Sequence, residues 1–187
     1  MFIRTIVITL ATFLACSATV LASETGDEKE ALEILKQSDV VSKFHKSAYG
    51  YAVFPTIGKG GIGIGGAHGT GGVYKGGARL GDVSMTQVSI GFQLGGQAYR
   101  QVVYFQDKRA FDEFTTGSFE FGAQAEAIAI TSSAGAQAGT EGASASANET
   151  QAEASYHKGM IVFTMGKGGL MFQAALGGQK YSYTPAN

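Results

Sequence analysis

Cysteine and proline are scarce in this chain of 187 residues, which contains one cysteine and two prolines. A single cysteine cannot form an intramolecular disulfide, and it excludes a zinc site built from several cysteines. An excess of one charge sign is also lacking, because 14 basic and 15 acidic residues leave a net charge of −1. This balance excludes a nucleic-acid binder driven by bulk charge. The chain is instead rich in glycine, with 28 residues against an average usage of about 7 %.

The 44 % hydrophobic content and the length predict one folded domain. The amino-terminal residues have the pattern of a secretory signal peptide, because residues 5–15 form an apolar run too short to span a bilayer. We expect residues 1–22 to be this signal peptide and residues 23–187 to be a single exported domain. Lipidation of Cys16 is the alternative to simple cleavage after Ala22. Either reading predicts a bacterial protein of the periplasm or cell envelope.

Charge is distributed unevenly along the chain. Residues 23–42 carry a net charge of −4, residues 43–109 of +6, residues 110–157 of −7 and residues 158–187 of +3. The basic blocks are also the glycine-rich ones. Oppositely charged strands that pair across a sheet would explain this pattern. A dipolar surface with one face suited to anions explains it as well.

Two short helices are predicted near the start of the mature chain. Thr25 and Glu28 have the spacing of a capping box, which predicts a helix that begins at Thr25. Ser38 precedes a second helical pattern, in which three apolar residues share one face: Val41, Phe44 and Ala48. This face either packs on the core or lies on a membrane surface, an alternative that the neighbouring Lys43 and Lys46 keep open.

From Gly50 onward the apolar period changes from helical to two, which is typical of strands. The clearest strand covers residues 88–94, with Val88 and Ile90 buried and Gln87 outside. A buried run follows at residues 101–105, and then a helix capped by Asp107 that carries Phe111 and Phe114 and ends at Gly117. Further strands are expected near residues 119–129, 143–147, 152–157, 160–163 and 170–176.

Many strands and few helices predict an α+β, mainly β fold. We expect a curled antiparallel sheet, barrel- or sandwich-like, with a few short helices that include an amino-terminal helical segment. An internal repeat supports this organisation, because residues 53–62 are echoed by residues 162–170, the second copy being one residue shorter. Each copy contains Gly-Lys-Gly-Gly, which we interpret as the turn of a hairpin. Two related hairpins would bring Lys59 and Lys167 to similar positions.

No reactive constellation is found in the sequence. Residues 58–63 match G-x-G-x-x-G, but a dinucleotide fold needs a helix next, and strand-like residues follow instead. The three histidines, His45, His68 and His157, lack metal-ligand spacing. No serine lies in a G-x-S-x-G motif. We therefore expect a protein that is not an enzyme and that holds no cofactor and no metal.

Several motifs, taken in order, resemble the SYLF domain family. They are residues 48–55 (AYGYAVFP), the glycine tract of residues 59–66, residues 69–73 (GTGGV), residues 88–99 (VSIGFQLGGQAY), residues 110–114 (AFDEF) and residues 155–159 (SYHKG). The resemblance covers roughly residues 28–184. It implies phosphoinositide binding and, as in yeast members, binding to actin filaments. Because this chain has a predicted signal peptide, lipid binding carries over more readily than actin binding.

The leading functional hypothesis is a non-catalytic envelope protein that binds anionic phospholipid headgroups. The expected contacts come from the basic blocks: Lys59, Lys167, Lys75 and Arg79, with Lys43 and Lys46 assisting. Each cation near an anionic surface contributes about 1 kcal/mol, so binding should be weak and sensitive to salt. The alternative is a structural or assembly protein that binds a protein partner or self-associates through its glycine- and alanine-rich strands. Nucleic acid is not an expected partner.

Overall fold

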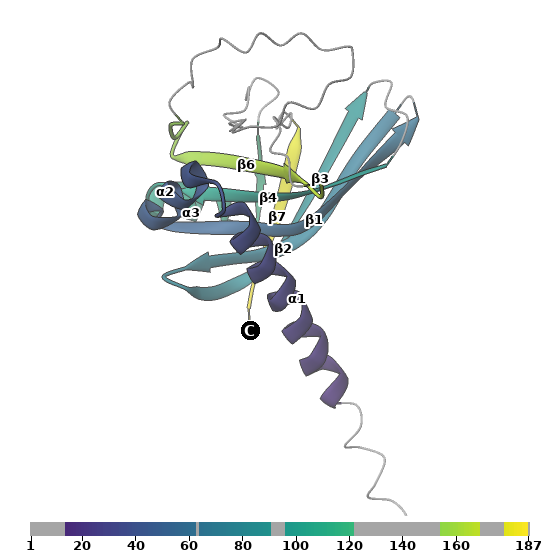
Figure 1. Cartoon of the computed structure of the whole chain (residues 1–187), viewed down its shortest axis with the longest axis horizontal. Helices are drawn as coiled ribbons and strands as arrows, with labels where there is room; N and C mark the ends of the chain where they lie inside the picture. Colours follow the sequence, from purple (N-terminus) through teal and green to yellow (C-terminus); the bar gives the residue numbers. More distant parts are fainter. Residues whose placement is uncertain (1–13, 63, 91–95, 122–153, 169–177, 187) are drawn as a thin grey trace, which may run out of the picture.

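The computed structural model describes residues 14–62, 64–90, 96–121, 154–168 and 178–186. Within these residues, seven strands form one sheet in the order β5-β7-β3-β2-β1-β4-β6, and every neighbouring pair is antiparallel. The sheet curls into a half-barrel (Figure 1). The strands are β1 (Gly50–Ile62), β2 (Ile64–Lys75), β3 (Ala78–Ile90), β4 (Gln97–Phe105), β5 (Ser118–Glu120), β6 (Met160–Gly166) and β7 (Gln179–Pro185).

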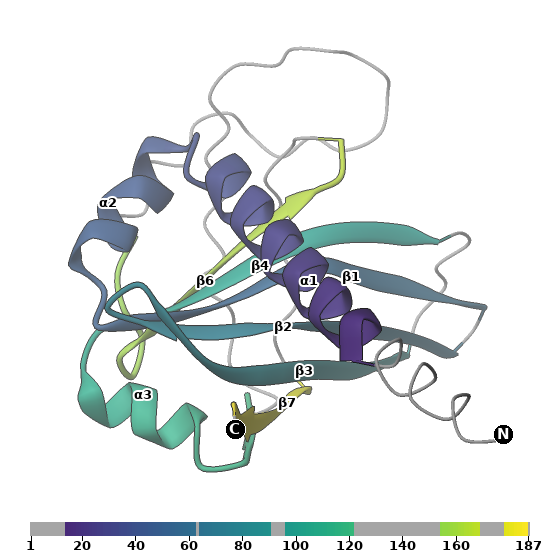
Figure 2. The ribbon, with the colours of Figure 1, turned by 90° about the horizontal axis from the view of Figure 1, so that it is seen from below.

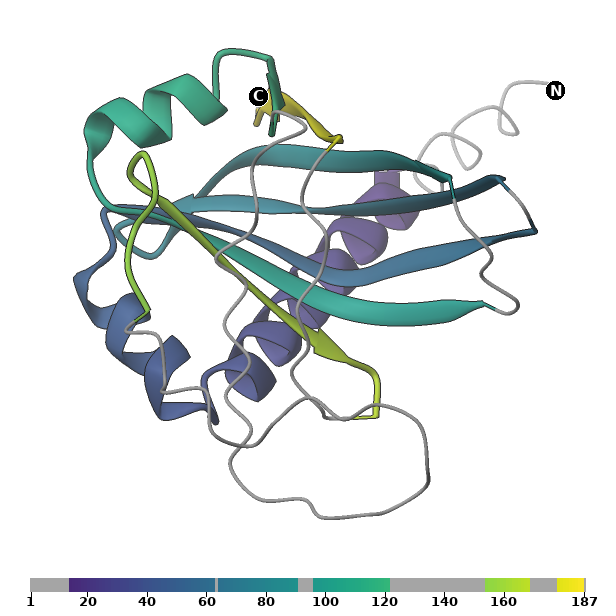
Figure 3. The ribbon, with the colours of Figure 1, turned by 90° about the horizontal axis from the view of Figure 1, so that it is seen from above.

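The described helices lie on one face and at one end of this sheet. Helix α1 (Leu14–Leu35) runs diagonally across the strands, whereas α2 (Asp39–Ser47) and α3 (Lys108–Phe114) lie apart from each other at the same end of the sheet (Figure 2). The opposite face of the sheet is seen in Figure 3, with α1 behind the strands. None of the described helices combines the length and the apolar character needed to cross a bilayer. The predicted mainly β fold with a curled antiparallel sheet and an amino-terminal helix is confirmed.

Apolar side chains are buried on both faces of the sheet. The helix-side core lies between the sheet and helices α1 and α2, and it contains Leu35, Val41, Phe44, Tyr104 and Phe163 among others. The inner core lies on the opposite face and contains Phe54, Ile57, Phe105, Phe114 and Tyr181 among others. Because β1 and β4 contribute side chains to both cores, residues 52–54 of β1 and residues 101–105 of β4 are all buried.

Two of the predicted helices are confirmed in detail. Helix α2 follows an extended residue at Ser38, and its Val41 and Phe44 are buried against the sheet. The apolar face of α2 therefore packs on the core and is not free to lie on a membrane. Helix α3 follows Asp107, whose carboxylate accepts a hydrogen bond of 2.9 Å from the amide of Ala110, and the chain turns at Gly117 with φ of 114°.

The predicted start of α1 is wrong. The helix begins at Leu14 and continues through Thr25, so the capping-box residues lie inside it. The residues before Thr25 include alanine and leucine, which favour helix, so the helix does not need to start at a cap. Residues 1–13 lie outside the described residues, and the signal peptide therefore stays a prediction.

The central strand β1 contains a β-bulge at Pro55. Phe54 pairs with Gln101 on β4 and Ile57 pairs with Tyr99, so one extra residue lies between these two pairs. A bulge suits proline, which has no amide hydrogen to donate to the ladder. The neighbouring strand β2 comes very close here, because a Cβ added to Gly71 would lie 1.9 Å from the carbonyl oxygen of Val53. Only glycine fits at this position.

The orientation predicted for the end of β3 is wrong. Val88 is 75 % exposed, whereas Gln87 is only 9 % exposed. Gln87 is buried because its side chain accepts a hydrogen bond of 3.4 Å from Gln179. Gln179 also accepts a hydrogen bond from Tyr181, whose hydroxyl in turn accepts one of 2.7 Å from Gln101. Gln87 therefore continues the buried face of β3 that begins with Val83 and Met85, and Val88 lies on the other face.

Of the other predicted strands, some are confirmed, some are wrong and some lie outside the described residues. The strand near residues 160–163 is confirmed as β6, and residues 101–105 form the buried end of β4. Residues 154–156 are not in a strand, and His157 forms only an isolated bridge with Met160. The first Gly-Lys-Gly-Gly sequence lies inside β1 and is not a turn. The strands expected at 143–147 and 170–176, and most of 119–129, lie outside the described residues.

The bulge makes a prediction about stability. Gly71→Ala should lower the free energy of unfolding by about 3 kcal/mol, because its methyl group would overlap the backbone of Val53. Gly58→Ala is the matched control, since an added Cβ there meets no atom within 4 Å, and it should change the value by less than about 1 kcal/mol. Urea denaturation of both variants measures the difference. Equal stabilities would contradict the close approach of β1 and β2.

Candidate functional site

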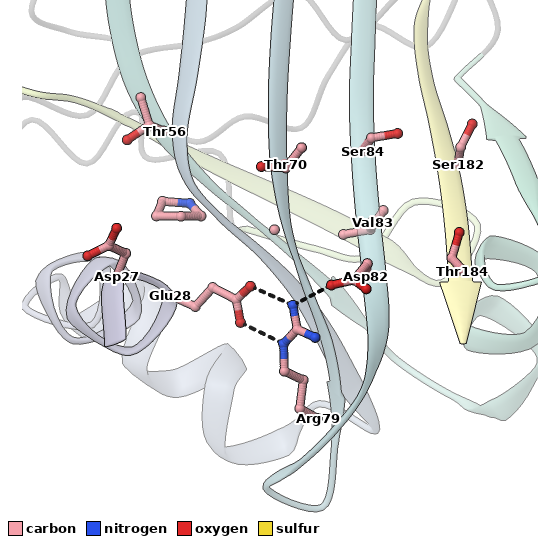
Figure 4. Close-up of a pocket in the computed structure, with 12 residues that line it drawn as sticks. Asp27, Glu28, Thr56, Thr70, Arg79, Asp82, Val83, Ser84, Ser182 and Thr184 are labelled. Carbon is pink, nitrogen blue, oxygen red and sulfur yellow. Dashed lines mark hydrogen bonds and ion pairs between the residues drawn. The ribbon is translucent and has the colours of Figure 1, made fainter. Parts of the chain in front are cut away.

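A hollow on the described surface lies between α1 and the sheet. It has a volume of about 530 Å³ and lies between Asp27 and Glu28 on α1 and the strands β1, β2, β3 and β7 (Figure 4). This volume is within the range of roughly 300–1,000 Å³ that is typical of small-molecule sites. We call this hollow the helix groove.

Four hydroxyl side chains form a row across the floor of the helix groove. Thr56 on β1 is opposite Thr70 on β2, Thr70 is opposite Ser84 on β3, and Ser84 is opposite Ser182 on β7. Directly opposed residues in a sheet point to the same face, and all four line the groove (Figure 4). With strands about 4.8 Å apart, the row is about 14 Å long. The bulge at Pro55 is what puts Thr56 on this face.

A buried carboxylate closes one side of the helix groove. Glu28 is 2 % exposed and forms a bidentate ion pair with Arg79, with Nε to Oε2 at 3.0 Å and Nη2 to Oε1 at 2.9 Å. Arg79 also donates to Asp82 at 2.8 Å, and the hydroxyl of Tyr74 donates to Glu28. A Cβ on Gly72 would lie 2.5 Å from Glu28 Oε2, so the ion pair occupies the space above that glycine. These contacts attach α1 to β2 and β3.

The pKa values of Arg79 and Tyr74 are both raised at this ion pair. The hydrogen bond from Arg79 to Glu28 raises the pKa of the guanidinium further above its usual range. Burial, followed by the hydrogen bond to Glu28, raises the pKa of Tyr74. Arg79 therefore stays charged and Tyr74 stays protonated at any physiological pH. The lining of the helix groove has three carboxylates (Asp27, Glu28 and Asp82) against one guanidinium, so its charge is negative.

Across the part of the chain that the structure describes, no group of three or more histidine, cysteine, aspartate or glutamate side chains has a metal-binding arrangement. The chemistry of the helix groove is hydrogen bonding by hydroxyls and carboxylates. The sequence analysis missed Glu28 as a groove residue because the capping-box reading gave it another role. One signal could have found it, since residues 28, 31, 32 and 35 have the i, i+3, i+4, i+7 spacing of one buried helix face.

Three of the six predicted lipid-binding cations lie at one end of the molecule. Lys43 and Lys46 are exposed on α2, and Lys75 lies at the end of β2 with its Nζ 4.6 Å from the ring centre of Tyr49. Lys158 lies at the same end, where its carbonyl accepts a hydrogen bond from Arg109 of α3. Within the described part of the chain, none of these four lysines has a carboxylate within ion-pair distance. We call these four residues the basic end.

Lys59 and Lys167 do not meet in a shared patch, contrary to the prediction from the repeat. Strands β1 and β6 do flank β4, but Lys59 is opposite Gln97, whereas the amide of Lys167 donates to Ala98. Alternation from the buried Ile57 puts Lys59 on the face away from α1. Lys167 lies on the α1 face, where it lines a small hollow with Asp27 and Glu30. The extra residue of the bulge causes this offset.

Arg79 also departs from its predicted role. Its guanidinium contacts two carboxylates, so its charge is already compensated and its side chain is 18 % exposed. It is a structural cation of the helix groove and is not available to an anionic surface in the way that the exposed lysines are.

The buried ion pair predicts an effect on stability. Glu28→Gln should lower the free energy of unfolding by about 2–3 kcal/mol, because Arg79 would keep only the exposed Asp82 as a charged partner. Glu30→Gln, the same change at an exposed position of α1, is the control and should have an effect of less than about 0.5 kcal/mol. Chemical denaturation of both variants tests this. Indistinguishable variants would mean that Glu28 does not hold α1 to the sheet.

Comparison with known proteins identifies the family. A family model described as Ysc84, Las17-binding protein actin regulator, matches residues 86–184. The match extends from the second half of β3 to β7 and covers more than half of the chain. A comparison with curated proteins gives no match. The resemblance found in the sequence motifs is thus confirmed, and the chain belongs to the Ysc84 family, also called the SYLF domain family.

Proposed function

We propose that this protein is a non-catalytic binding domain that attaches to anionic phospholipid headgroups through the basic end. Family membership supports lipid binding or actin-regulator-like binding as the general class. The observation that carries the finer proposal is the gathering of Lys43, Lys46, Lys75 and Lys158 at one end, all exposed. A membrane is a broad anionic surface, and exposed lysines at one end of a domain can contact it together.

The contacts among neighbouring segments hold the basic end in a fixed shape. The ring of Phe44 on α2 lies 5.1 Å from that of Tyr156, just before the turn that carries Lys158. Tyr49, which follows α2, packs against Phe111 of α3 at 5.8 Å and lies below the ammonium group of Lys75. The backbone that carries the lysines is therefore held by packed elements, and little of it needs to become ordered when the lysines bind.

The strength of such binding follows from the number of charges. Each lysine near an anionic surface contributes about 1 kcal/mol at most, and screening over a Debye length of about 8 Å reduces this at physiological salt. Four lysines give weak, reversible and salt-sensitive attachment. A lipid on Cys16 would strengthen it, and we propose an exported, envelope-associated location in which anionic headgroups are available.

Vesicle sedimentation tests the proposal. The full chain should bind vesicles of phosphatidylcholine containing about 30 % phosphatidylglycerol, bind pure phosphatidylcholine much less, and be released between about 50 and 500 mM salt. Replacement of Lys43, Lys46 and Lys75 together by glutamine should weaken binding about tenfold or more at low salt. Equal binding to neutral and anionic vesicles would overturn the proposal.

A matched control distinguishes binding through the basic end from binding through the net charge of the protein. Glutamine at Lys59, Lys167 and Lys180 removes the same total charge from three exposed or half-exposed positions outside the basic end. This variant should retain most of the binding. If both triple variants lose affinity equally, binding depends on overall charge and not on the basic end.

The family description supports binding of a protein partner as a second candidate. A related possibility is that the partner is a second copy of this chain, bound through the glycine- and alanine-rich strands. Light scattering at increasing protein concentration distinguishes this candidate, because self-association raises the average mass whereas attachment to lipid does not.

A further inference from the structure

We infer that the helix groove is a second, separate binding site whose ligand is a neutral or cationic oligosaccharide. This goes beyond the proposed lipid binding and uses other residues. The groove lies between the carboxyl-terminal half of α1 and the sheet, whereas the basic end is formed by α2 and the turns beside it. The argument rests on the row of hydroxyls, the charge of the lining and the apolar atoms between the hydroxyls.

The first step concerns hydrogen bonding. Thr56, Thr70, Ser84 and Ser182 each have a hydroxyl that both donates and accepts, and they follow one another across four strands. Thr184 adds a fifth hydroxyl on β7, opposite Asp82. A ligand that matches such a row must itself carry regularly spaced groups that donate and accept. Sugar rings joined in a chain have this property.

The second step concerns charge. Arg79 is already paired with Glu28 and Asp82. The groove therefore offers an incoming ligand the negative charge of Asp27, which forms no ion pair among the described residues, and part of that of Asp82. The cations Arg100 and Lys167 line the neighbouring small hollow and not the helix groove. Phosphate-bearing headgroups and acidic sugars would be repelled. Carboxylates accept well from sugar hydroxyls and better still from ammonium groups. This favours a neutral glycan and, more strongly, an amino-sugar chain.

The third step concerns the apolar part of the lining. The ring of Pro55 and the carbon atoms of the threonines Thr56, Thr70 and Thr184 also line the groove, whereas the side chain of Val83 is buried in the inner core on the opposite face. A pyranose ring presents C–H groups on its faces and hydroxyls at its edge, so it needs a surface of this mixed kind. An extended peptide would need free backbone groups, but in this part of the sheet the strands are paired with each other.

Nuclear magnetic resonance titration of the full chain tests the inference with three probes of four sugar rings each. They are a β-1,4-linked glucosamine tetramer, cellotetraose and tetragalacturonate, which are cationic, neutral and anionic. The amide signals of Thr70, Ser84 and Ser182 should shift with the first two probes. The glucosamine tetramer should bind about fivefold or more tightly than cellotetraose at low salt, and tetragalacturonate should leave these signals unchanged.

Variants in the row make the test specific. Thr70→Val and Ser84→Ala each remove one hydroxyl from an exposed or half-exposed position, and each should weaken binding about fivefold. Thr86→Val is the matched control, because Thr86 lies on the same face of β3 one row further along, opposite His68, and does not line the groove. It should bind as the unmodified chain does.

Two results would overturn the inference. One is the absence of shifts at the groove with both the cationic and the neutral probe. The other is an equal loss in Thr86→Val and Thr70→Val, which would mean that the oligosaccharide contacts the exposed sheet generally. Neither result affects the proposed lipid binding, because vesicle sedimentation reports on the basic end.

Discussion

The one residue that is inserted into β1 at Pro55 determines much of this structure. It allows Phe54 and Ile57, three positions apart, to enter the same inner core, which regular alternation would forbid. It turns Thr56 toward the α1 face, and it moves Lys59 to the opposite one. It also brings the backbone of β1 so close to β2 that residue 71 has no room for a side chain. The floor of the helix groove and the distribution of the lysines both follow from this bulge.

The two candidate surfaces differ because of where the acidic residues of α1 lie. Asp27 and Glu28 approach the sheet beside Arg79, so this part of the molecule is negative although the sequence block around Arg79 is basic. At the other end, α2 and the turn of β2 expose lysines that form no ion pair among the described residues. Attachment to an anionic surface and binding of a neutral ligand are therefore compatible in one molecule.

The sequence allowed the class of fold, helices α2 and α3, and several strands to be predicted, because these depend on local patterns. The cap at Asp107 and the stripe of Val41 and Phe44 are examples. Features that depend on distant partners were not predictable. Gln87 is buried because Gln179, 92 residues later, supplies its hydrogen bond. Of the candidate site, the exposed lysines of α2 and β2 could be identified, but not the pairing of Arg79 with Glu28, which joins residues 51 positions apart.

The position of β7 between β3 and β5 has a consequence for how the chain reaches its folded state. This strand is the last of the described strands, and it carries Tyr181, which is fully buried among Phe54, Phe114 and Phe119. The inner core cannot close until residues 179–185 have been synthesised. Until then, the edge of β3 and the surrounding aromatic rings are exposed to other chains, and nascent molecules need protection from aggregation during that interval.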